Sequence, residues 1–141
     1  MFKKIIYAAS ASLILMSMFG CNVSSPTSPA NSNPLVGTWT MTTQTVTSSS
    51  GNVTTNNASA LFGNTYIFSG DYSLSGTTIL FGGQFNFSGT WSSTADSVTL
   101  SLSGSSSQTW HYAVSGSNLT MTRGVAQGSG TQTTVEHYAK Q

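Results

Sequence analysis

The stretch Leu35-Val36-Gly37-Thr38-Trp39 begins the first strand-like run of this 141-residue chain. Gly37 has no Cβ, so the backbone can pass close beneath another element at this point. The indole of Trp39 is large enough to plug one end of a closed sheet and to bury its apolar area there. The triplet returns as Gly89-Thr90-Trp91 at the end of a later run. We therefore expect both tryptophans to form the floor of one structure.

From Leu35 onward, bulky apolar side chains alternate with small polar ones, which is the period of β-strands. No window outside the first twenty residues has the period of a helix. The pattern predicts about eight short strands joined mostly by turns of hairpin length. Two longer loops are expected, a polar one at 47–59 and a glycine-rich one at 124–130.

A closed sheet suits this composition better than an open one. Charged residues make up only 5% of the chain, so it lacks the lysines that protect exposed sheet edges from association. Closure removes those edges and turns the apolar face of every strand inward. The predicted fold class is therefore all-β, a small antiparallel up-and-down barrel of about eight strands over residues 35–141. A β-sandwich tolerates the same alternation and is the alternative.

Strand parity predicts which side chains face the interior. The predicted inward set is Trp39, Met41, Tyr66, Phe68, Phe85, Phe87, Trp91, Val98, Leu100, Leu102, Trp110, Tyr112, Leu119 and Met121. Its aromatic members are the candidates to line a ligand cavity, namely Trp39, Tyr66, Phe68, Phe85, Phe87, Trp91, Trp110 and Tyr112. An eight-stranded barrel is just wide enough to be filled by side chains or to hold one small ligand. Parity does not choose between a filled and a hollow interior.

The Gly-x-Trp start, followed only by short strands and tight turns, resembles the lipocalin-like domains of small bacterial lipoproteins. The resemblance covers the chain from about Pro34 to its end and rests on Gly37, Trp39 and the strand rhythm. It implies a barrel that binds a small hydrophobic molecule. Inhibitors of host lysozyme also use small lipoprotein barrels, but those generally carry a disulfide, and this chain has one cysteine.

Residues 1–20 have the pattern of an export signal, with Lys3 and Lys4 followed by an apolar run. The run is too short for a membrane-spanning helix. The single cysteine follows at once in Met18-Phe19-Gly20-Cys21, which resembles the lipobox of bacterial lipoproteins. The resemblance implies that the chain is cut before Cys21 and acylated on it. The alternative is cleavage by the general signal peptidase, which leaves a free thiol.

Residues 21–34 are expected to form the lipidated cysteine and a disordered tether, because prolines and small polar residues cannot bury enough surface to order themselves. Asn22 follows the cysteine where an Asp would retain a lipoprotein in the inner membrane, by analogy with enterobacterial sorting. The predicted location is therefore the cell envelope, with the acyl anchor in the outer membrane. Nothing in the sequence indicates the oligomeric state.

The inventory of ionisable groups argues against catalysis, cofactors and nucleic-acid binding. After Cys21 the chain keeps two cations and three acids, a net charge of −1, so no basic patch exists for phosphates. Asp71 and Asp96 lie in expected turns. Glu136 and His137 are strand neighbours and must point to opposite faces. His111 and His137 without a third ligand make a weak metal site, so no metal is expected.

Two hypotheses for function follow. In the first, the protein is a membrane-anchored, non-enzymatic lipoprotein whose barrel binds a small hydrophobic ligand. In the second, it is a non-catalytic surface or periplasmic lipoprotein with a filled barrel, which binds a macromolecular partner through its loops. The interior volume of the barrel distinguishes them.

Overall fold

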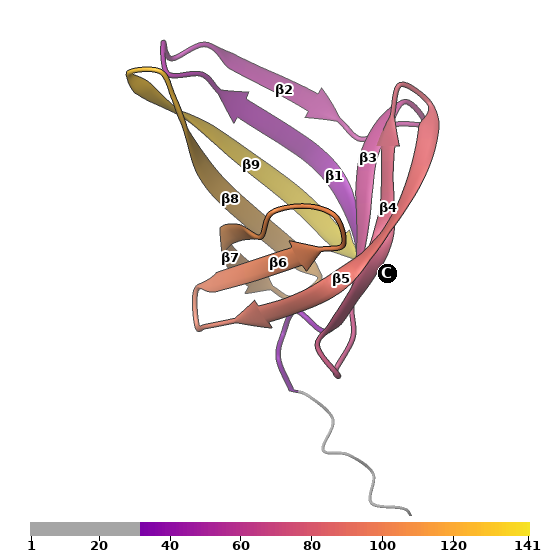
Figure 1. The fold of residues 1–141 in the computed structure, drawn as a ribbon. Helices are drawn as coiled ribbons and strands as arrows, with labels where there is room; N and C mark the ends of the chain where they lie inside the picture. The colour runs from indigo at the N-terminus through magenta and orange to yellow at the C-terminus, as the bar shows by residue number, and fades with distance from the viewer. Residues whose placement is uncertain (1–31) are drawn as a thin grey trace, which may run out of the picture.

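The computed structural model of the protein describes residues 32–141 (Figure 1). This part of the chain contains nine β-strands and no helix. The strands are β1 (Gly37–Thr47), β2 (Val53–Asn57), β3 (Phe62–Phe68), β4 (Ser73–Leu80), β5 (Gly83–Ser93), β6 (Ser97–Leu102), β7 (Gln108–Ser115), β8 (Asn118–Gln127) and β9 (Gly130–Lys140). The all-β prediction is confirmed.

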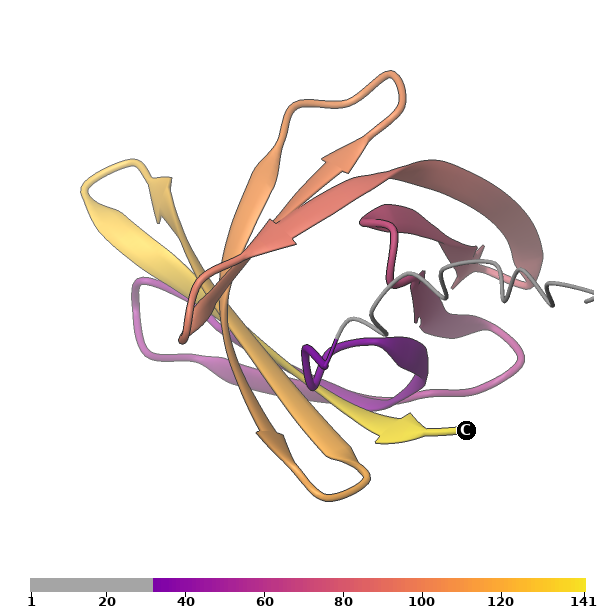
Figure 2. The ribbon, with the colours of Figure 1, turned by 90° about the horizontal axis from the view of Figure 1, so that it is seen from below.

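The sheet closes on itself as an antiparallel barrel. The strand order is β2-β1-β3-β4-β5-β6-β7-β8-β9, and an additional pairing of β1 with β9 joins the two sides. Eight strands form the closed barrel, and Figure 2 shows them from below as a ring. Up-and-down connectivity follows from the short turns, because antiparallel neighbours need only a hairpin to join them. Across residues 32–141, no helix has the length and apolar character to cross a membrane.

The polar loop expected at 47–59 contains a strand instead. β2 pairs with the second half of β1, in the register Gln44↔Asn56 and Val46↔Thr54. All five residues of β2 are exposed. The sequence of β2 does not signal a strand because it lacks alternating apolar residues, whereas backbone hydrogen bonds to β1 suffice at the edge of a hairpin.

The prediction of a glycine-rich loop at 124–130 is also wrong. β8 continues to Gln127 and β9 starts at Gly130, so only a two-residue turn separates them. The pairs Gly124↔Thr133 and Val125↔Gln132 extend this hairpin. Small and polar residues are tolerated here because the hairpin end is exposed, where no core selects bulky side chains.

A β-bulge in β1 changes which of its side chains face inward. The register with β9 shifts between Met41 and Thr43. Trp39 and Met41 are buried, Thr42 is exposed, and Gln44 then takes the inward parity, because it bonds the buried Glu136. An extra residue in one strand reverses the alternation beyond it, so parity counted from Trp39 fails at this point.

Most of the predicted inward set forms the core. Trp39, Val98, Leu119 and Met121 are fully buried, and Phe87, Leu102 and Tyr112 are half-buried against them. The prediction that Phe85 belongs to the interior is wrong. Its side chain is 59% exposed, although it has the inward parity of β5. Leu35, Leu74 and Tyr138 are core residues absent from the predicted set. Parity is periodic along a strand, but burial also requires that other strands reach the same level of the barrel.

Both Gly-x-Trp glycines lie where the chain passes close to another element. A Cβ on Gly37, where φ is +138°, would lie 2.7 Å from Cε of Lys140. A Cβ on Gly89 would lie 2.1 Å from the carbonyl oxygen of Ser101. The expected close approach at Gly37 is confirmed, and it lets the end of β9 fold over Trp39.

The last residues of the predicted tether pack on the barrel. Asn33 accepts a hydrogen bond from the Leu35 amide, and its side-chain nitrogen donates to Ser93 Oγ over 2.7 Å. The part of the chain that packs on the barrel therefore includes Asn33, slightly before Leu35. The predicted signal peptide, Cys21 and the tether up to residue 31 lie outside the described residues.

Candidate functional site: the mouth and interior of the barrel

The inward side chains form three levels between the two ends of the barrel. One end, the floor, is closed by large apolar residues. The middle level carries polar side chains, which we call the polar belt: Gln44, Asn64, Gln108, Arg123 and Glu136. The opposite end, the mouth, is bordered by apolar side chains that we call the rim: Leu61, Phe62, Leu80, Phe81 and Phe85. Inward side chains repeat every two residues along each strand. The registers between neighbouring strands align these positions, so that the three levels lie one above another.

Trp39 and Trp91 seal the floor. Nε1 of Trp39 donates to the Leu35 carbonyl over 2.7 Å, and Nε1 of Trp91 donates to the Ser69 carbonyl over 3.1 Å. Lys140 Nζ lies 5.2 Å from the centroid of the Trp39 ring, within the range of a cation–π contact. Main-chain carbonyls therefore satisfy both indole N–H groups at the floor.

Glu136 is a buried carboxylate whose two oxygens are both bonded. Its side chain is 4% exposed. Oε1 accepts from Gln44 Nε2 over 2.8 Å, and Oε2 accepts from the Tyr138 hydroxyl over 2.5 Å. These charge-assisted bonds offset part of the cost of burying the carboxylate. The sequence predicted that Glu136 and His137 face opposite sides, and His137 is indeed exposed.

Tyr66 and Tyr138 lie side by side beneath the belt, with ring centroids 5.6 Å apart. Burial raises the pKa of the Tyr66 hydroxyl well above its usual value, and the charge of Glu136 adds to this effect. Burial likewise raises the pKa of Tyr138, with further contributions from Tyr66 and Glu136. Both hydroxyls are therefore neutral hydrogen-bonding groups over the physiological pH range.

Arg123 and Trp110 form a second polar contact on the adjoining strands. The Arg123 guanidinium carbon lies 4.8 Å from the centroid of the Trp110 ring, and Nη1 donates to Gln108 Oε1 over 2.5 Å. Within residues 32–141, the buried side-chain nitrogens without a hydrogen-bond partner are Nε of Arg123 and Nε1 of Trp110. Buried donors are normally paired, so these two N–H groups are exceptions in the interior of the barrel.

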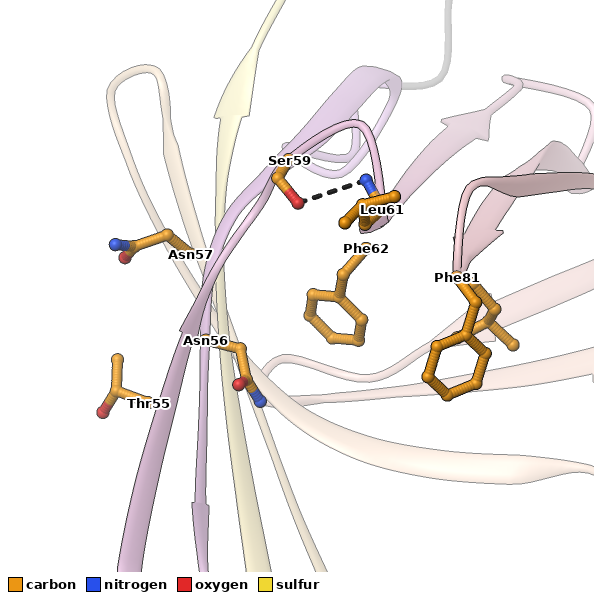
Figure 3. A pocket seen from close by; sticks show the side chains of 8 residues that line it. Thr55, Asn56, Asn57, Ser59, Leu61, Phe62 and Phe81 are labelled. Carbon is orange, nitrogen blue, oxygen red and sulfur yellow. Dashed lines mark hydrogen bonds between the residues drawn. The ribbon is translucent and has the colours of Figure 1, made fainter.

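A pocket of about 540 Å³ opens at the mouth (Figure 3). Its lining residues come from β2, the β2–β3 connection, the start of β3 and the tip of the β4–β5 hairpin: Thr55, Asn56, Asn57, Ser59, Leu61, Phe62, Leu80 and Phe81. Figure 3 shows the Asn56 side chain turned toward Phe62. Asn56 is also the register partner of Gln44, which places the wall of the pocket beside the polar belt.

Phe81 occupies an unusual position on the rim. Leu80 pairs with Gly83, so Phe81 and Gly82 are the two central residues of a tight turn. Both have positive φ, +51° at Phe81 and +82° at Gly82, as in a type I′ turn, where Asn or Gly normally stands first. The Phe81 side chain is 98% exposed, so no packing in the barrel offsets this backbone strain.

None of the predicted ligand-lining aromatics lines the mouth pocket. Trp39, Phe68 and Trp91 belong to the packed floor, and Tyr66 packs against Phe68, Phe87 and Tyr138. Trp110 packs against Arg123 of the polar belt, Tyr112 donates to the Thr94 carbonyl, and Phe85 is on the rim. Sequence analysis missed the lining residues Leu61, Phe62, Leu80 and Phe81. The available signal was that bulky apolar residues directly precede glycines, at Phe62-Gly63 and Phe81-Gly82.

The remaining ionisable residues that the sequence analysis considered lie in turns or on the surface. Asp71 accepts from both the amide and hydroxyl of Ser73, and these bonds lower its pKa. Asp96 accepts from the hydroxyls of Ser97 and Thr94, which lower its pKa in the same way. Among residues 32–141 no group of three or more His, Cys, Asp or Glu side chains is arranged to hold a metal ion.

The fold is similar to a solved structure, that of a lipocalin-like protein from Bacteroides uniformis. The two align with a TM-score of 0.51 and 18% sequence identity, over 77% of this chain and 99% of the other. At this identity the similarity concerns the fold, and it agrees with the predicted lipocalin-like barrel. No protein-family model matches the sequence, and a comparison with curated proteins gives no match.

Proposed function

We propose that this protein is a non-catalytic bacterial lipoprotein of the cell envelope whose lipocalin-like barrel binds a small apolar molecule at its mouth. The observation that supports it most directly is the pocket of about 540 Å³ above a sealed floor. Sites for small molecules usually have volumes of about 300–1,000 Å³ and a mostly apolar lining with a few polar groups. Leu61, Phe62, Leu80 and Phe81 supply the apolar part here, and Asn56 supplies a polar group.

The point of entry of the chain supports a lipid anchor. Leu35 and Asn33 lie at the floor, against Trp39 and Ser93, so the segment from Cys21 joins the barrel at the end opposite the mouth. In Figure 1 the first described residues are at the bottom and the β4–β5 turn is at the top. An anchor at Cys21 is thus connected to the closed end of the barrel and leaves the mouth free for a ligand.

Binding of the neutral dye Nile red to the full chain carrying Cys21→Ser tests the pocket, because the substitution removes any acyl chain that competes for it. We expect saturable fluorescence enhancement, weakened about tenfold in a Leu61→Asn/Leu80→Thr double variant that removes roughly 1.4 kcal/mol of apolar contact. Ile67→Thr is the matched control, because Ile67 is 40% exposed but does not line the pocket. Unsaturable binding, or equal loss in the control, would contradict the proposal.

The anchor is tested separately in cells. Metabolic labelling with an alkyne analogue of palmitate should label the wild-type protein and not the Cys21→Ser variant. The wild type should fractionate with outer membranes, whereas the variant should be released with periplasmic contents. Labelling that persists in the variant would place the lipid elsewhere.

A loop-borne macromolecular partner is the second candidate, and the exposure of Phe81 favours it. An aromatic side chain 98% exposed on a strained turn offers an anchor for a protein surface. In that case Phe81→Asn abolishes capture of a partner by in-cell crosslinking while leaving Nile red binding unchanged.

A further inference from the structure

We propose that the mouth pocket binds an extended, uncharged peptide, which pairs as an additional strand with the free edge of β2. This inference rests on the proposed binding function and names the chemical class of its ligand. The bound peptide directs apolar side chains into the pocket, so that one ligand combines main-chain hydrogen bonds with apolar contacts. Peptides that extend a sheet gain affinity from the first and specificity from the second.

The first argument is that one edge of β2 has no neighbouring strand within residues 32–141. β2 stands at one end of the strand order and pairs with β1 alone. The Ala58 amide donates to the Thr42 carbonyl, in the register that joins β1 and β2. Hydrogen-bonded pairs alternate along an antiparallel ladder, so the even-numbered residues of β2 bond β1. The main-chain N–H and C=O groups of Val53, Thr55 and Asn57 therefore point away from β1.

The second argument is that this edge borders the mouth pocket. Thr55, Asn56 and Asn57 all line the pocket. Figure 3 shows the Asn56 side chain turned toward Phe62, whereas the side chains of Thr55 and Asn57 point to the other side of β2. Thr55 and Asn57 therefore border the pocket through their main chain. Free N–H and C=O groups thus share the pocket with the apolar side chains of Phe62 and Phe81.

The third argument is that nothing protects this edge or repels an uncharged strand. Exposed edge strands usually carry lysine or proline, which prevent pairing with another chain. Residues 47–63 contain neither, and they contain no charged residue of any kind. Every residue that lines the pocket is also uncharged. A charged peptide side chain placed there loses hydration without gaining a partner, so the site favours an uncharged peptide.

The register of β2 specifies the pattern of the peptide. Peptide residues opposite Val53, Thr55 and Asn57 exchange hydrogen bonds with β2 and direct their side chains away from the pocket. The two residues between them direct theirs into it. The matching probe is the capped peptide acetyl-Thr-Leu-Thr-Leu-Thr-amide, in which both leucines face the rim.

Displacement of Nile red from the Cys21→Ser protein by this peptide tests the inference. We expect saturable displacement. Methylation of the central threonine nitrogen removes a donor that faces β2, and it should weaken displacement at least about tenfold. Methylation of the second leucine nitrogen is the matched control, because that N–H points away from β2. Equal losses from the two methylated peptides overturn the inference.

The same hydrogen bond is tested from the side of the protein with Thr55→Pro and Thr55→Val. Proline removes the outward N–H and is tolerated on edge strands, whereas valine keeps this N–H. Both variants lose the bond between the Thr45 and Thr55 hydroxyls, so they differ mainly in the main-chain donor. The ratio of peptide affinity to Nile red affinity should fall about tenfold in the proline variant alone.

Hydrogen exchange on the Cys21→Ser protein keeps the test decisive if Thr55→Pro fails to fold. The peptide should slow exchange of the Thr55 and Asn57 amides and leave Ala58 unchanged, because the Ala58 amide already bonds Thr42. Unchanged exchange at Thr55 and Asn57 overturns the inference, while saturable Nile red binding still supports the mouth pocket. Loss of saturable Nile red binding overturns the proposed function itself. A dimer in sedimentation that Thr55→Pro abolishes assigns the edge to a second copy and also overturns the inference.

Discussion

The indole nitrogen of Trp39 donates a 2.7 Å hydrogen bond to the carbonyl oxygen of Leu35, four residues earlier in the chain. Both side chains are completely buried. The bond turns the entering segment under the barrel, so that Leu35 fills the floor beneath the ring. Trp39 therefore acts as a hydrogen-bonding plug, whose stability contribution combines packing with a satisfied buried carbonyl.

Replacing this plug should be costly. Trp39→Phe leaves a cavity and an unpaired Leu35 carbonyl, and we expect the free energy of unfolding to fall by about 2–4 kcal/mol. Urea denaturation measures the loss. Tyr112→Phe is the control, because its hydroxyl bonds the Thr94 carbonyl at an exposed site, and its cost should remain under about 1 kcal/mol. Similar losses in the two variants would show that Trp39 does not have this structural role.

The second Gly-x-Trp glycine should tolerate no side chain. In Gly89→Ala the new Cβ meets backbone, 2.1 Å from the Ser101 oxygen, and no flexible side chain can move aside. We expect a loss of about 3 kcal/mol or more, since β5 and β6 must separate locally. Gly63→Ala is the control, because the nearest atom to the new Cβ is Ala58 Cβ at 3.7 Å. Its free energy of unfolding, measured by thermal denaturation, should change by less than about 1 kcal/mol.

Phe81→Asn should stabilise the protein and weaken ligand binding at the same time. Asn adopts positive φ more readily than Phe, and Asn-Gly is the preferred pair for this turn. With Phe81 98% exposed, little packing is lost, so we expect a gain of about 0.5–1 kcal/mol and a higher Tm. Nile red affinity should decrease. A variant that is less stable than the wild type would refute the interpretation of Phe81 as a strained residue retained for binding.

Stability should fall in alkaline solution because of Tyr66 and Tyr138. Burial raises the pKa of both hydroxyls above their value of about 10 in the unfolded chain. Above that pH the folded protein binds more protons than the unfolded chain, so the free energy of unfolding decreases with rising pH. The slope is up to about 1.4 kcal/mol per pH unit for each tyrosine, and the contribution is fully present below about pH 10.

Urea denaturation between pH 8 and 11.5, with tyrosinate absorbance in parallel, checks this slope. Tyr66→Phe should reduce it by about half, since one of the two linked groups is removed. Glu136→Gln should allow ionisation of Tyr66 and Tyr138 at lower pH, because the negative charge that opposes it is gone. A slope unchanged in both variants would exclude these residues as its source.

Alternation along the chain was enough to predict an all-β barrel and the buried floor at Trp39 and Trp91. These properties depend on local parity, which any half-buried strand must obey. Exact burial was less predictable, as Phe85 shows. Its parity is inward, but it stands at a level of the barrel where the neighbouring strands no longer enclose it.

The mouth and the polar belt depended on the tertiary structure. A bulge at Thr42 reverses the parity of β1 and brings Gln44 to Glu136, and no residue pattern signals where a bulge will form. Arg123 and Trp110 meet only because β7 and β8 pair in one register. Local sequence therefore specifies which side chains share a face, whereas barrel closure and stagger decide which of them reach the same level and can act together.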